Sequence, residues 1–261
     1  MRLALAAVPL GLAIRSASAM LVQVEQYGMA QCPMTSTLTT DFFNDCFVHG
    51  YEISTLVNYT LNMVGGSHGG PLGNSTTAWN SSFHGNQEIV ADKYQLCSRD
   101  LEQKTNPTTA TNAGGYQWVN FTSCLNGYQG IAICTYYLPH EIPDAAKVCA
   151  EATGFNWHDL YTCVNSQRGT DLYKASVEFT SDQMAKKTIP PYGTGKDQGI
   201  PIIRIAGTTY KGTIGAFNNL GKEICKAAGK GPLSGCGCFR TYPPPQAADE
   251  QEAPKVWSPF S

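Results

Sequence analysis

Apolar and polar positions alternate near both ends of the chain. Residues 21–27 (LVQVEQY) alternate in this way, which predicts a β-strand, and residues 51–63 predict a second strand. Residues 201–205 and 208–210 predict a β-hairpin that turns at Ala206-Gly207. We expect these strands to belong to one small α/β domain that is formed by the two ends of the chain.

Helical periodicity follows Cys32 and fills the middle of the chain. Leu38, Phe42 and Cys46 recur at a spacing of four, which predicts a helix with one apolar face, and a closing helix is predicted over residues 214–228. The middle of the chain predicts helices over residues 88–104, 144–152, 157–165 and 180–185, and either a strand or the start of a helix over 116–121. This layout is α/β, and it is that of a thioredoxin-like fold split by a mostly helical insertion, about residues 64–185.

Composition limits what the protein can be. The chain has 261 residues, 10 cysteines and a formal net charge of −2. This length is enough for one domain with a sizeable core, or for one domain with a large insertion. The charge is close to zero and no basic run stands out, which argues against nucleic acid as a partner.

The first 19 residues have the pattern of a secretory signal peptide. Arg2 precedes an apolar stretch, and residues 17–19 (ASA) are a small-residue cleavage site, so we expect the mature chain to begin at Met20. The alternative is an uncleaved anchor, but the apolar stretch is short and is interrupted by a proline and a glycine. We expect no stable membrane insertion, because no later segment is long and apolar enough.

Four Asn-X-Ser/Thr sequons indicate glycosylation in the secretory pathway. Together with a signal peptide and ten cysteines they predict an oxidising compartment, so we expect a secreted protein or one of the endolysosomal lumen. The candidate asparagines are Asn58, Asn74, Asn80 and Asn120. Asn58 is the weakest candidate because it lies in a predicted strand. Residues 240–261 are rich in Pro, Gln and Glu and predict a disordered tail.

Cys32 stands where the first predicted strand gives way to a helix. Pro33 suits the first turn of a helix, where a missing N–H costs nothing. The N-terminus of a helix carries partial positive charge and N–H groups without partners, so we expect a lowered thiol pKa and a nucleophilic thiolate. The alternative is that Cys32 is one half of a structural disulfide.

Ile200-Pro201 directly precedes the predicted hairpin. In thioredoxin folds this position carries a cis proline beside the active cysteine, and the exposed backbone next to it can bind an extended substrate chain. We therefore expect Pro33, Ile200 and Pro201 to line a substrate groove next to Cys32.

Further motifs follow one another in order over about residues 22 to 238. They are VQVEQYGMAQCP (22–33), LVNY (56–59), Phe83-His84-Gly85 followed by Glu88 and Cys97, then Cys124, Cys149 and Cys163, Gly169 and Leu172, Thr180, Pro190-Pro191, Ile200-Pro201, and Cys225 and Cys236 on either side of Gly229-Lys230. In this order and spacing the chain resembles the gamma-interferon-inducible lysosomal thiol reductase (GILT) family. The resemblance implies a thioredoxin-like domain over residues 20–239, with a disulfide-bonded insertion, that reduces protein disulfides without a bound cofactor.

The chain departs from the family pattern at its active site. The family has Cys-x-x-Cys, whereas Thr35 stands here in the fourth position, and Ser82 and Ile89 replace two further cysteines of the family signature. A threonine hydroxyl cannot resolve a mixed disulfide, but it can donate a hydrogen bond to a thiolate. We expect a single nucleophile, Cys32, with Thr35 as its hydrogen-bond donor, and release of the substrate by an external thiol reductant.

The remaining cysteines allow several pairings. Cys46 lies on the apolar face of the first predicted helix and is interpreted as a buried thiol that forms no disulfide, about 21 Å along the helix from Cys32. The resemblance implies a disulfide between Cys225 and Cys236. The connectivity of the others stays open; they are Cys97, Cys124, Cys134, Cys149, Cys163 and Cys238. Two alternatives are that all ten cysteines are bridged, and that Cys134 or Cys238 is a remote resolving partner.

Two further side-chain groups have more than one interpretation. His84 either assists proton transfer, since a histidine titrates near neutral pH, or is a structural residue of the insertion. Cys236-Gly237-Cys238 is too closely spaced for a zinc site, and no nearby His or Cys completes one, so we expect no metal.

Two classes of function fit these features. The leading hypothesis is a thiol–disulfide oxidoreductase that reduces or isomerises protein disulfides through Cys32 in the secretory or endolysosomal pathway. The alternative is a secreted, non-catalytic binding protein on a degenerate thiol-reductase scaffold, which the loss of the second cysteine favours. A chaperone-like holdase is a third interpretation, in which substrate binding does not depend on Cys32.

Overall fold

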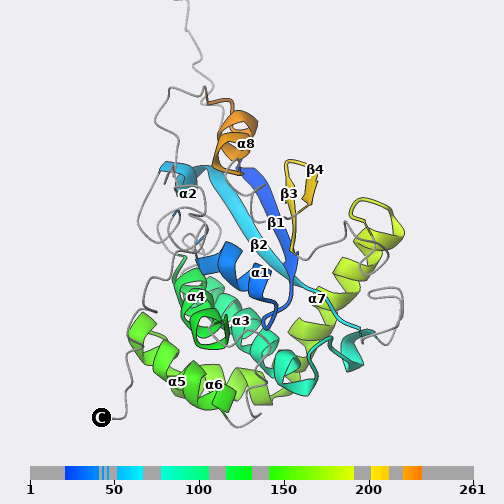
Figure 1. Cartoon of the computed structure of the whole chain (residues 1–261). Coiled ribbons are helices and arrows are strands. Elements are labelled where there is room, and N and C mark those ends of the chain that lie inside the picture. Colours follow the sequence, from blue (N-terminus) through cyan, green and yellow to red (C-terminus); the bar gives the residue numbers. More distant parts are fainter. Residues whose placement is uncertain are drawn as a thin grey trace, which may run out of the picture.

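A four-stranded mixed β-sheet forms the centre of the fold (Figure 1). The computed structural model describes residues 21–40, 43, 46, 52–66, 78–105, 116–130, 141–190, 201–211 and 220–230. The strands are β1 (Val22–Gly28), β2 (Val57–Met63), β3 (Ile202–Ile205) and β4 (Thr208–Lys211), in the order β2-β1-β3-β4. β1 pairs in parallel with β2 and antiparallel with β3, and β3 pairs antiparallel with β4.

Strand β1 is the central strand, and it leads into the interior. Its register runs from Val22 opposite Val57 to Gly28 opposite Met63, and its last three residues are all buried. A strand that is covered on both faces loses the simple alternation of a half-exposed strand. The chain that follows β1 therefore starts from a buried and firmly paired position.

The hairpin between β3 and β4 turns where the sequence predicts it. Ala206 and Gly207 both have positive φ angles, of 47° and 84°. A two-residue turn between twisted strands requires both of its residues to adopt the left-handed backbone conformation. Glycine adopts this conformation without strain and Ala206 at a cost, so the pairing of the strands on either side must outweigh that cost.

Helices cover the sheet and fill the long connection between β2 and β3. The helices are α1 (Pro33–Thr37), α2 (Glu52–Leu56), the 3-10 helix η2 (Ala78–Asn80), α3 (Asn86–Thr105), α4 (Gln117–Gly130), α5 (Glu141–Thr153), α6 (Trp157–Asn165), α7 (Gln167–Ala185) and α8 (Leu220–Ala227). Figure 1 shows α3 to α6 gathered on the side of the sheet where α1 lies, with α8 at the opposite end. The sheet order, with α1 after β1 and α8 after the hairpin, is thioredoxin-like, and the helices between β2 and β3 are the predicted insertion.

Several predicted elements are confirmed, with changes in extent. Residues 88–104 and 157–165 are helical, as α3 and α6, the predicted helix 144–152 lies within α5, and residues 117–121 begin α4. Helix α7 starts at Gln167, well before the predicted 180, because Ser166 caps it: the Ser166 hydroxyl oxygen accepts the Arg168 N–H at 3.2 Å. Of the predicted closing helix, residues 214–219 lie outside the described residues.

The predicted strand over residues 51–63 is wrong in its first part. Residues 52–56 form helix α2, and extended structure begins only at Val57. Ile53 and Val57 are both fully buried, so the apolar pattern continues across the boundary between the helix and the strand. Short apolar runs do not distinguish a helical turn from a strand, which explains the error.

Two disulfides hold the helices of the insertion together. Cys97 of α3 is bonded to Cys163 of α6, and Cys124 of α4 to Cys149 of α5. These bonds confirm a disulfide-bonded insertion and assign the pairing of its described cysteines. A separate cluster of buried apolar side chains, formed largely by α3 to α6, surrounds these bonds.

The interpretation of Cys46 as a buried thiol outside any disulfide is wrong. Cys46 is fully buried, as predicted, but it is disulfide-bonded, and so is Cys225. Burial on an apolar helix face is equally compatible with a thiol and with a disulfide sulfur, so the sequence pattern could not separate them. Cys134, Cys236 and Cys238 lie outside the described residues.

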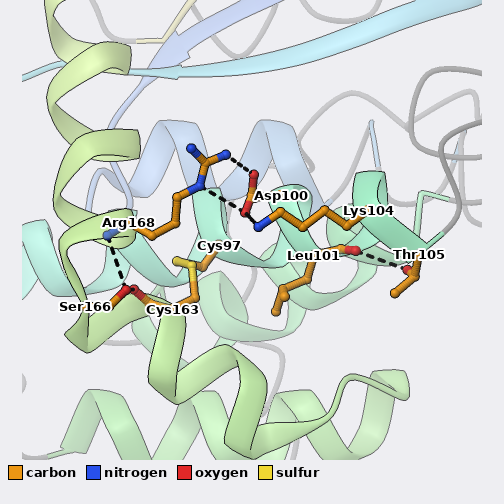
Figure 2. A network of polar contacts seen from close by, with 8 residues as sticks. All are labelled: Cys97, Asp100, Leu101, Lys104, Thr105, Cys163, Ser166 and Arg168. Carbon is orange, nitrogen blue, oxygen red and sulfur yellow. Dashed lines mark hydrogen bonds and ion pairs between the residues drawn. A yellow bond between two sulfur atoms is a disulfide. The ribbon is translucent and has the colours of Figure 1, made fainter.

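A polar network lies beside the Cys97–Cys163 disulfide (Figure 2). Arg168, at the start of α7, donates hydrogen bonds to Asp100 of α3 from Nη2 and, at 3.3 Å, from Nε, and Lys104 Nζ lies 2.7 Å from Asp100 Oδ2. Burial alone raises the pKa of Asp100, but hydrogen bonds from Arg168 and Lys104 outweigh burial and lower this pKa overall. The second half of α3 is thus held to α6 and α7 by a disulfide and by ion pairs.

No helix in the described ranges is long and apolar enough to cross a membrane. The predicted signal peptide, residues 1–19, and the predicted tail, residues 240–261, lie outside the described residues.

Candidate active site

Cys32 lies at the N-terminus of α1, directly after the central strand. Met29, Ala30 and Gln31 form a turn between β1 and the helix, and the Cys32 N–H donates to the Met29 carbonyl at 3.2 Å. Cys32 is the N-cap residue, with φ −77° and ψ 119°, and Pro33 begins the helix. The Ser36 N–H donates to the Cys32 carbonyl at 2.9 Å. The predicted strand–turn–cysteine–helix arrangement is therefore present.

Cys32 carries a thiol, whereas the other cysteines in the described part of the chain are oxidised. Six of these seven cysteines are disulfide-bonded: Cys46, Cys97, Cys124, Cys149, Cys163 and Cys225. The alternative in which all ten cysteines are bridged does not hold for Cys32 in this structure.

An apolar cluster surrounds the sulfur. Cys32 is half-buried, and together with Phe83 it packs against buried side chains from the end of β1, the end of α7 and the start of β3. These side chains are Tyr27, Met29, Val64, Met184, Ile189 and Ile202. Such surroundings exclude water and disfavour a charged sulfur.

The predicted lowering of the Cys32 pKa is wrong. Burial raises the pKa of the Cys32 thiol above its ordinary value, and the negative charge of Glu88 adds to this effect. The backbone N–H groups of Thr35 and Met34 and the Thr35 hydroxyl act in the opposite direction, but they do not compensate for burial. Burial is the largest of these influences, and the apolar cluster that causes it draws on β1, α7 and β3.

Thr35 follows Cys32 by three residues, in the first turn of α1, and packs against Gly28 at the end of β1. Its side chain is fully buried, and its hydroxyl makes no hydrogen bond of ordinary geometry. A Cβ atom on Gly28 would lie 2.6 Å from Thr35 Oγ1, so the glycine that ends β1 is needed to make room. A buried hydroxyl without an acceptor, close enough to Cys32 to lower the thiol pKa, is a donor that a thiolate could use.

Two buried carboxyl groups hold the turn from behind, and the sequence analysis did not assign them this role. Asp92 Oδ1 accepts the Ala30 N–H at 2.8 Å, and Glu88 Oε1 accepts the Gln31 N–H at 3.4 Å. Neither carboxyl group is exposed to solvent. The signal in the sequence was two acidic residues four apart on a helix, a spacing that places both on one face.

His84 is the ionisable neighbour of this carboxyl pair. Its Nδ1 lies 2.7 Å from Glu88 Oε1, and its backbone N–H donates to Glu88 Oε2 at 3.2 Å. The Ser82 hydroxyl donates to the same Oε2. His84 therefore contacts the residue that faces Cys32, and both of its predicted roles, proton transfer and structure, stay open.

The other predicted site residues lie in different surroundings. Pro201 is buried directly before β3, next to Ile202 of the cluster around Cys32, whereas Ile200 and the sequon residue Asn74 lie outside the described residues. The remaining sequon asparagines are Asn80, exposed in η2; Asn58, which donates to Gln23 Oε1 at 3.0 Å; and Asn120, half-buried in α4. Within the described residues no group of three or more His, Cys, Asp or Glu side chains could hold a metal ion.

No protein-family model and no curated protein matches the sequence. Among solved structures, the chain is similar to oxidised BdbD from Bacillus subtilis, with a TM-score of 0.48, 17% identity, and coverage of 80% of this chain and 88% of that chain. It is also similar to DsbA from Chlamydia trachomatis, with a TM-score of 0.47, 13% identity, and coverage of 78% of this chain and 85% of that chain. The fold assignment given above depends on the sheet order and the helix positions.

Proposed function

We propose that this protein is a thiol–disulfide oxidoreductase of the GILT type, with Cys32 as its single nucleophile. One observation supports this above all others: Cys32 carries a thiol in a chain whose six other described cysteines are disulfide-bonded. A thiol that persists at a helix start, beside a buried hydroxyl donor, is placed for exchange chemistry. The substrate class is a protein disulfide, and the compartment is the secretory or endolysosomal lumen.

The proposed reaction is thiol–disulfide exchange, and it uses no bound cofactor. The Cys32 thiolate attacks one sulfur of the substrate disulfide; a bond to Cys32 Sγ forms, the substrate S–S bond breaks, and the other substrate sulfur leaves as a thiolate that takes up a proton. Thr35 cannot complete the cycle, because it has no sulfur. Reduction therefore requires two thiols of an external reductant, which supply the two electrons. In isomerisation a substrate thiol attacks the mixed disulfide, and no net electrons are needed.

The raised pKa of Cys32 affects the pH, and therefore the compartment, in which the reaction is fast. Burial keeps most of the sulfur protonated at acid pH, so the attacking species is scarce there. The thiolate that does form is a stronger nucleophile than that of an acidic thiol. This combination favours a compartment near neutral pH, such as the early secretory pathway or the extracellular space, over a strongly acid one.

The test is capture, in non-reducing gels, of a protein that contains scrambled disulfides. Wild-type protein should form a mixed disulfide that a thiol reductant releases, and Cys32→Ser should form none. Thr35→Cys supplies the missing resolving sulfur and should convert the long-lived adduct into catalytic turnover. Adduct formation by Cys32→Ser at the wild-type level would refute the proposal.

The proposed role of Thr35 has its own matched pair of variants. Thr35→Ser keeps the hydroxyl and Thr35→Val removes it while keeping the shape. We expect Thr35→Val to slow adduct formation by about threefold to tenfold, because the thiolate loses a donor, and Thr35→Ser to change it little. Equal rates for the two variants would show that the hydroxyl has no part.

A non-catalytic binding protein remains a second candidate, because the raised pKa of Cys32 and the lack of a cysteine at position 35 both weaken catalysis. In that case Cys32 and Phe83, the partly buried side chains at the edge of the apolar cluster, would contact an unfolded chain without a covalent step. Binding of a cysteine-free unfolded peptide that survives alkylation of Cys32 would favour this candidate, or a holdase. Capture of a disulfide-containing protein, without binding of the cysteine-free peptide, would favour the exchange reaction.

Passage through the secretory pathway is part of the same proposal. Asn80 is exposed and is the best placed of the sequon asparagines within the described ranges. Protein recovered from the medium of a eukaryotic host should lose mass on treatment with an N-glycosidase, and Asn80→Gln should remove one glycan. Retention of unprocessed, unglycosylated protein inside the cells would contradict it.

A further inference from the structure

We propose that Glu88 and Asp92 are positioning residues for Cys32: they hold the turn that presents the sulfur and, through the charge that the pair carries, set how readily this sulfur ionises. The inference depends on the proposed role of Cys32 as the reactive thiol. It assigns to the insertion a part in the chemistry of the thioredoxin-like domain.

The positioning part follows from the hydrogen bonds. The Ala30 and Gln31 N–H groups, which directly precede Cys32, have as their acceptors Asp92 Oδ1 at 2.8 Å and Glu88 Oε1 at 3.4 Å. Both acceptors belong to α3, which is separated from the turn by more than 50 residues of sequence. The conformation of the turn is therefore fixed by the insertion and not by local sequence alone.

The charge of the pair follows from burial and from the surrounding groups. Burial and the neighbouring Glu88 hold the pKa of Asp92 well above its usual range, so Asp92 keeps its proton. The donors gather on Glu88, whose oxygens accept from the Gln31 and His84 N–H groups and from the Ser82 hydroxyl. His84 faces Glu88 at 2.7 Å from its own segment. From α7 the Tyr173 hydroxyl faces the pair, and burial with both carboxyl groups raises its pKa, so it stays neutral. From the turn, Cys32 lies within electrostatic reach of Glu88, whose charge is the smallest of the influences on the thiol pKa.

The consequence for Cys32 follows from simple electrostatics. When His84 is neutral, ionisation of Cys32 places a second negative charge beside that of Glu88, which is unfavourable in an apolar site. When His84 is protonated, its positive charge neutralises that of Glu88, and ionisation of Cys32 becomes less unfavourable. The contact of His84 Nδ1 with Glu88 Oε1 thus determines how strongly the carboxylate opposes ionisation of Cys32.

The experiment measures the rate of Cys32 alkylation by iodoacetamide in the native full-length protein, between about pH 5 and 9, by mass spectrometry of the peptide. Glu88→Gln removes the charge and should accelerate alkylation at neutral pH by at least about threefold. His84→Gln removes the imidazole that lies against Glu88 and should slow alkylation by at least about twofold. The two variants are expected to change the rate in opposite directions, which a loosened structure would not produce.

A matched control is available on the same helix. Glu102 is also buried on α3 and also accepts backbone N–H groups, from Gln117 at 3.1 Å and Trp118 at 2.7 Å, at the start of α4. Glu102→Gln should lower thermal stability as Glu88→Gln does and leave the alkylation profile of Cys32 unchanged. A thermal melt of each variant reports the stability separately.

The proposal is overturned if the pH profile of Cys32 alkylation in Glu88→Gln coincides with that of the wild type or of Glu102→Gln. It is also overturned if Glu88→Gln and His84→Gln change the alkylation rate in the same direction, or if alkylation does not depend on pH. If Glu88→Gln does not fold, His84→Gln, whose imidazole is partly exposed, decides alone. No substrate is present in this experiment. Opposite changes without any mixed disulfide in the capture assay would therefore refute the proposed function and leave the electrostatic role intact.

Discussion

Helix α3 buries carboxyl groups along its whole length, but its two halves surround them differently. In the first half, Glu88 and Asp92 are fully buried, face one histidine, and accept backbone N–H groups of the turn before Cys32. In the second half, Asp100 is also buried, but it binds Arg168 and Lys104, whose side chains are exposed, beside the Cys97–Cys163 disulfide. The pKa of Asp92 is raised and that of Asp100 is lowered. On the same helix, a negative charge is therefore unfavourable at Asp92 and stabilising at Asp100.

This difference indicates how the insertion serves the rest of the fold. The second half is built for rigidity, with a covalent bond and ion pairs. Glu88 and Asp92 in the first half, like Glu102 in the second, have no Lys or Arg partner among the described contacts and accept backbone N–H groups instead. Those of the first half belong to the turn before Cys32. Rigidity at one end allows α3 to hold the Cys32 turn at the other.

The largest effect should come from removing the Cys97–Cys163 disulfide in the second half of α3. The double variant Cys97→Ala/Cys163→Ala removes a bond between residues 66 apart in sequence, and in the chain-entropy model this costs about 4 kcal/mol of unfolding free energy. Urea unfolding of the double variant measures it. Cys32→Ala is the control, a cysteine lost without a bond, and should cost about 1 kcal/mol. Similar losses for the two proteins would contradict the structural importance of this disulfide.

The next effect should come from the first half of α3. The folded-state pKa of Asp92 is raised, so its contribution to stability is fully present below its unfolded-state pKa of about 3.9 and is lost as the pH rises. Asp92→Asn keeps an oxygen for the Ala30 N–H and does not titrate. We expect it to be more stable than the wild type by at least about 1 kcal/mol at pH 7.5 and equal to it near pH 4. Thermal melts across this range provide the measurement, and a gain that disappears at high pH would contradict the raised pKa.

For Asp100, in the second half of α3, we expect stability to depend on pH in the opposite direction. The folded-state pKa of Asp100 is lowered overall, so its contribution is present above about pH 3.9 and is lost as the pH falls through the folded-state pKa. Asp100→Asn should cost about 1 kcal/mol at pH 7, a modest value because Arg168 is half-exposed, and less below about pH 3. Melts of Asp92→Asn and Asp100→Asn under the same buffers should therefore give slopes of opposite sign. Parallel slopes would remove the distinction between the two halves.

The smallest effect should come from the exposed partner of Asp100. Lys104 Nζ lies 2.7 Å from Asp100 Oδ2, one helical turn away, and the lysine side chain is 59% exposed. Exposed pairs at this spacing contribute about 0.3–0.5 kcal/mol, so Lys104→Ala should be close to silent in chemical unfolding. A loss above about 1 kcal/mol would mean that Lys104, and not Arg168, is the main partner of Asp100.

The sequence predicted the parts of the fold that local patterns encode. The alternation in 21–27, the turn at Ala206-Gly207 and the period of α3 are local, and the structure confirms each of them. The boundary between α2 and β2 was missed, because buried Ile53 and Val57 continue one apolar run across it. The disulfide state of Cys46 was missed, because its partner depends on tertiary structure.

The candidate site was predicted in position but not in its electrostatics. Cys32, Pro33 and Thr35 could be placed from their order after a strand. The sign of the Cys32 pKa shift depends on side chains from α3, α7 and β3 that surround the sulfur, and no local pattern contains these contacts. The roles of Glu88 and Asp92 were missed for the same reason, since their partners are backbone N–H groups in a turn distant in sequence.

The pairing of the central strand has a consequence for biosynthesis. Val24 of β1 pairs with Ile205 of β3, so the edge of β1 stays open until the whole insertion and the hairpin have been synthesised. The Cys124–Cys149 loop lies within the Cys97–Cys163 loop, so the nascent insertion can close from the inside outward before β3 emerges. During that interval an unpaired strand edge is presented to chaperones, and the speed at which translation reaches β3 limits how long the chain is exposed to aggregation.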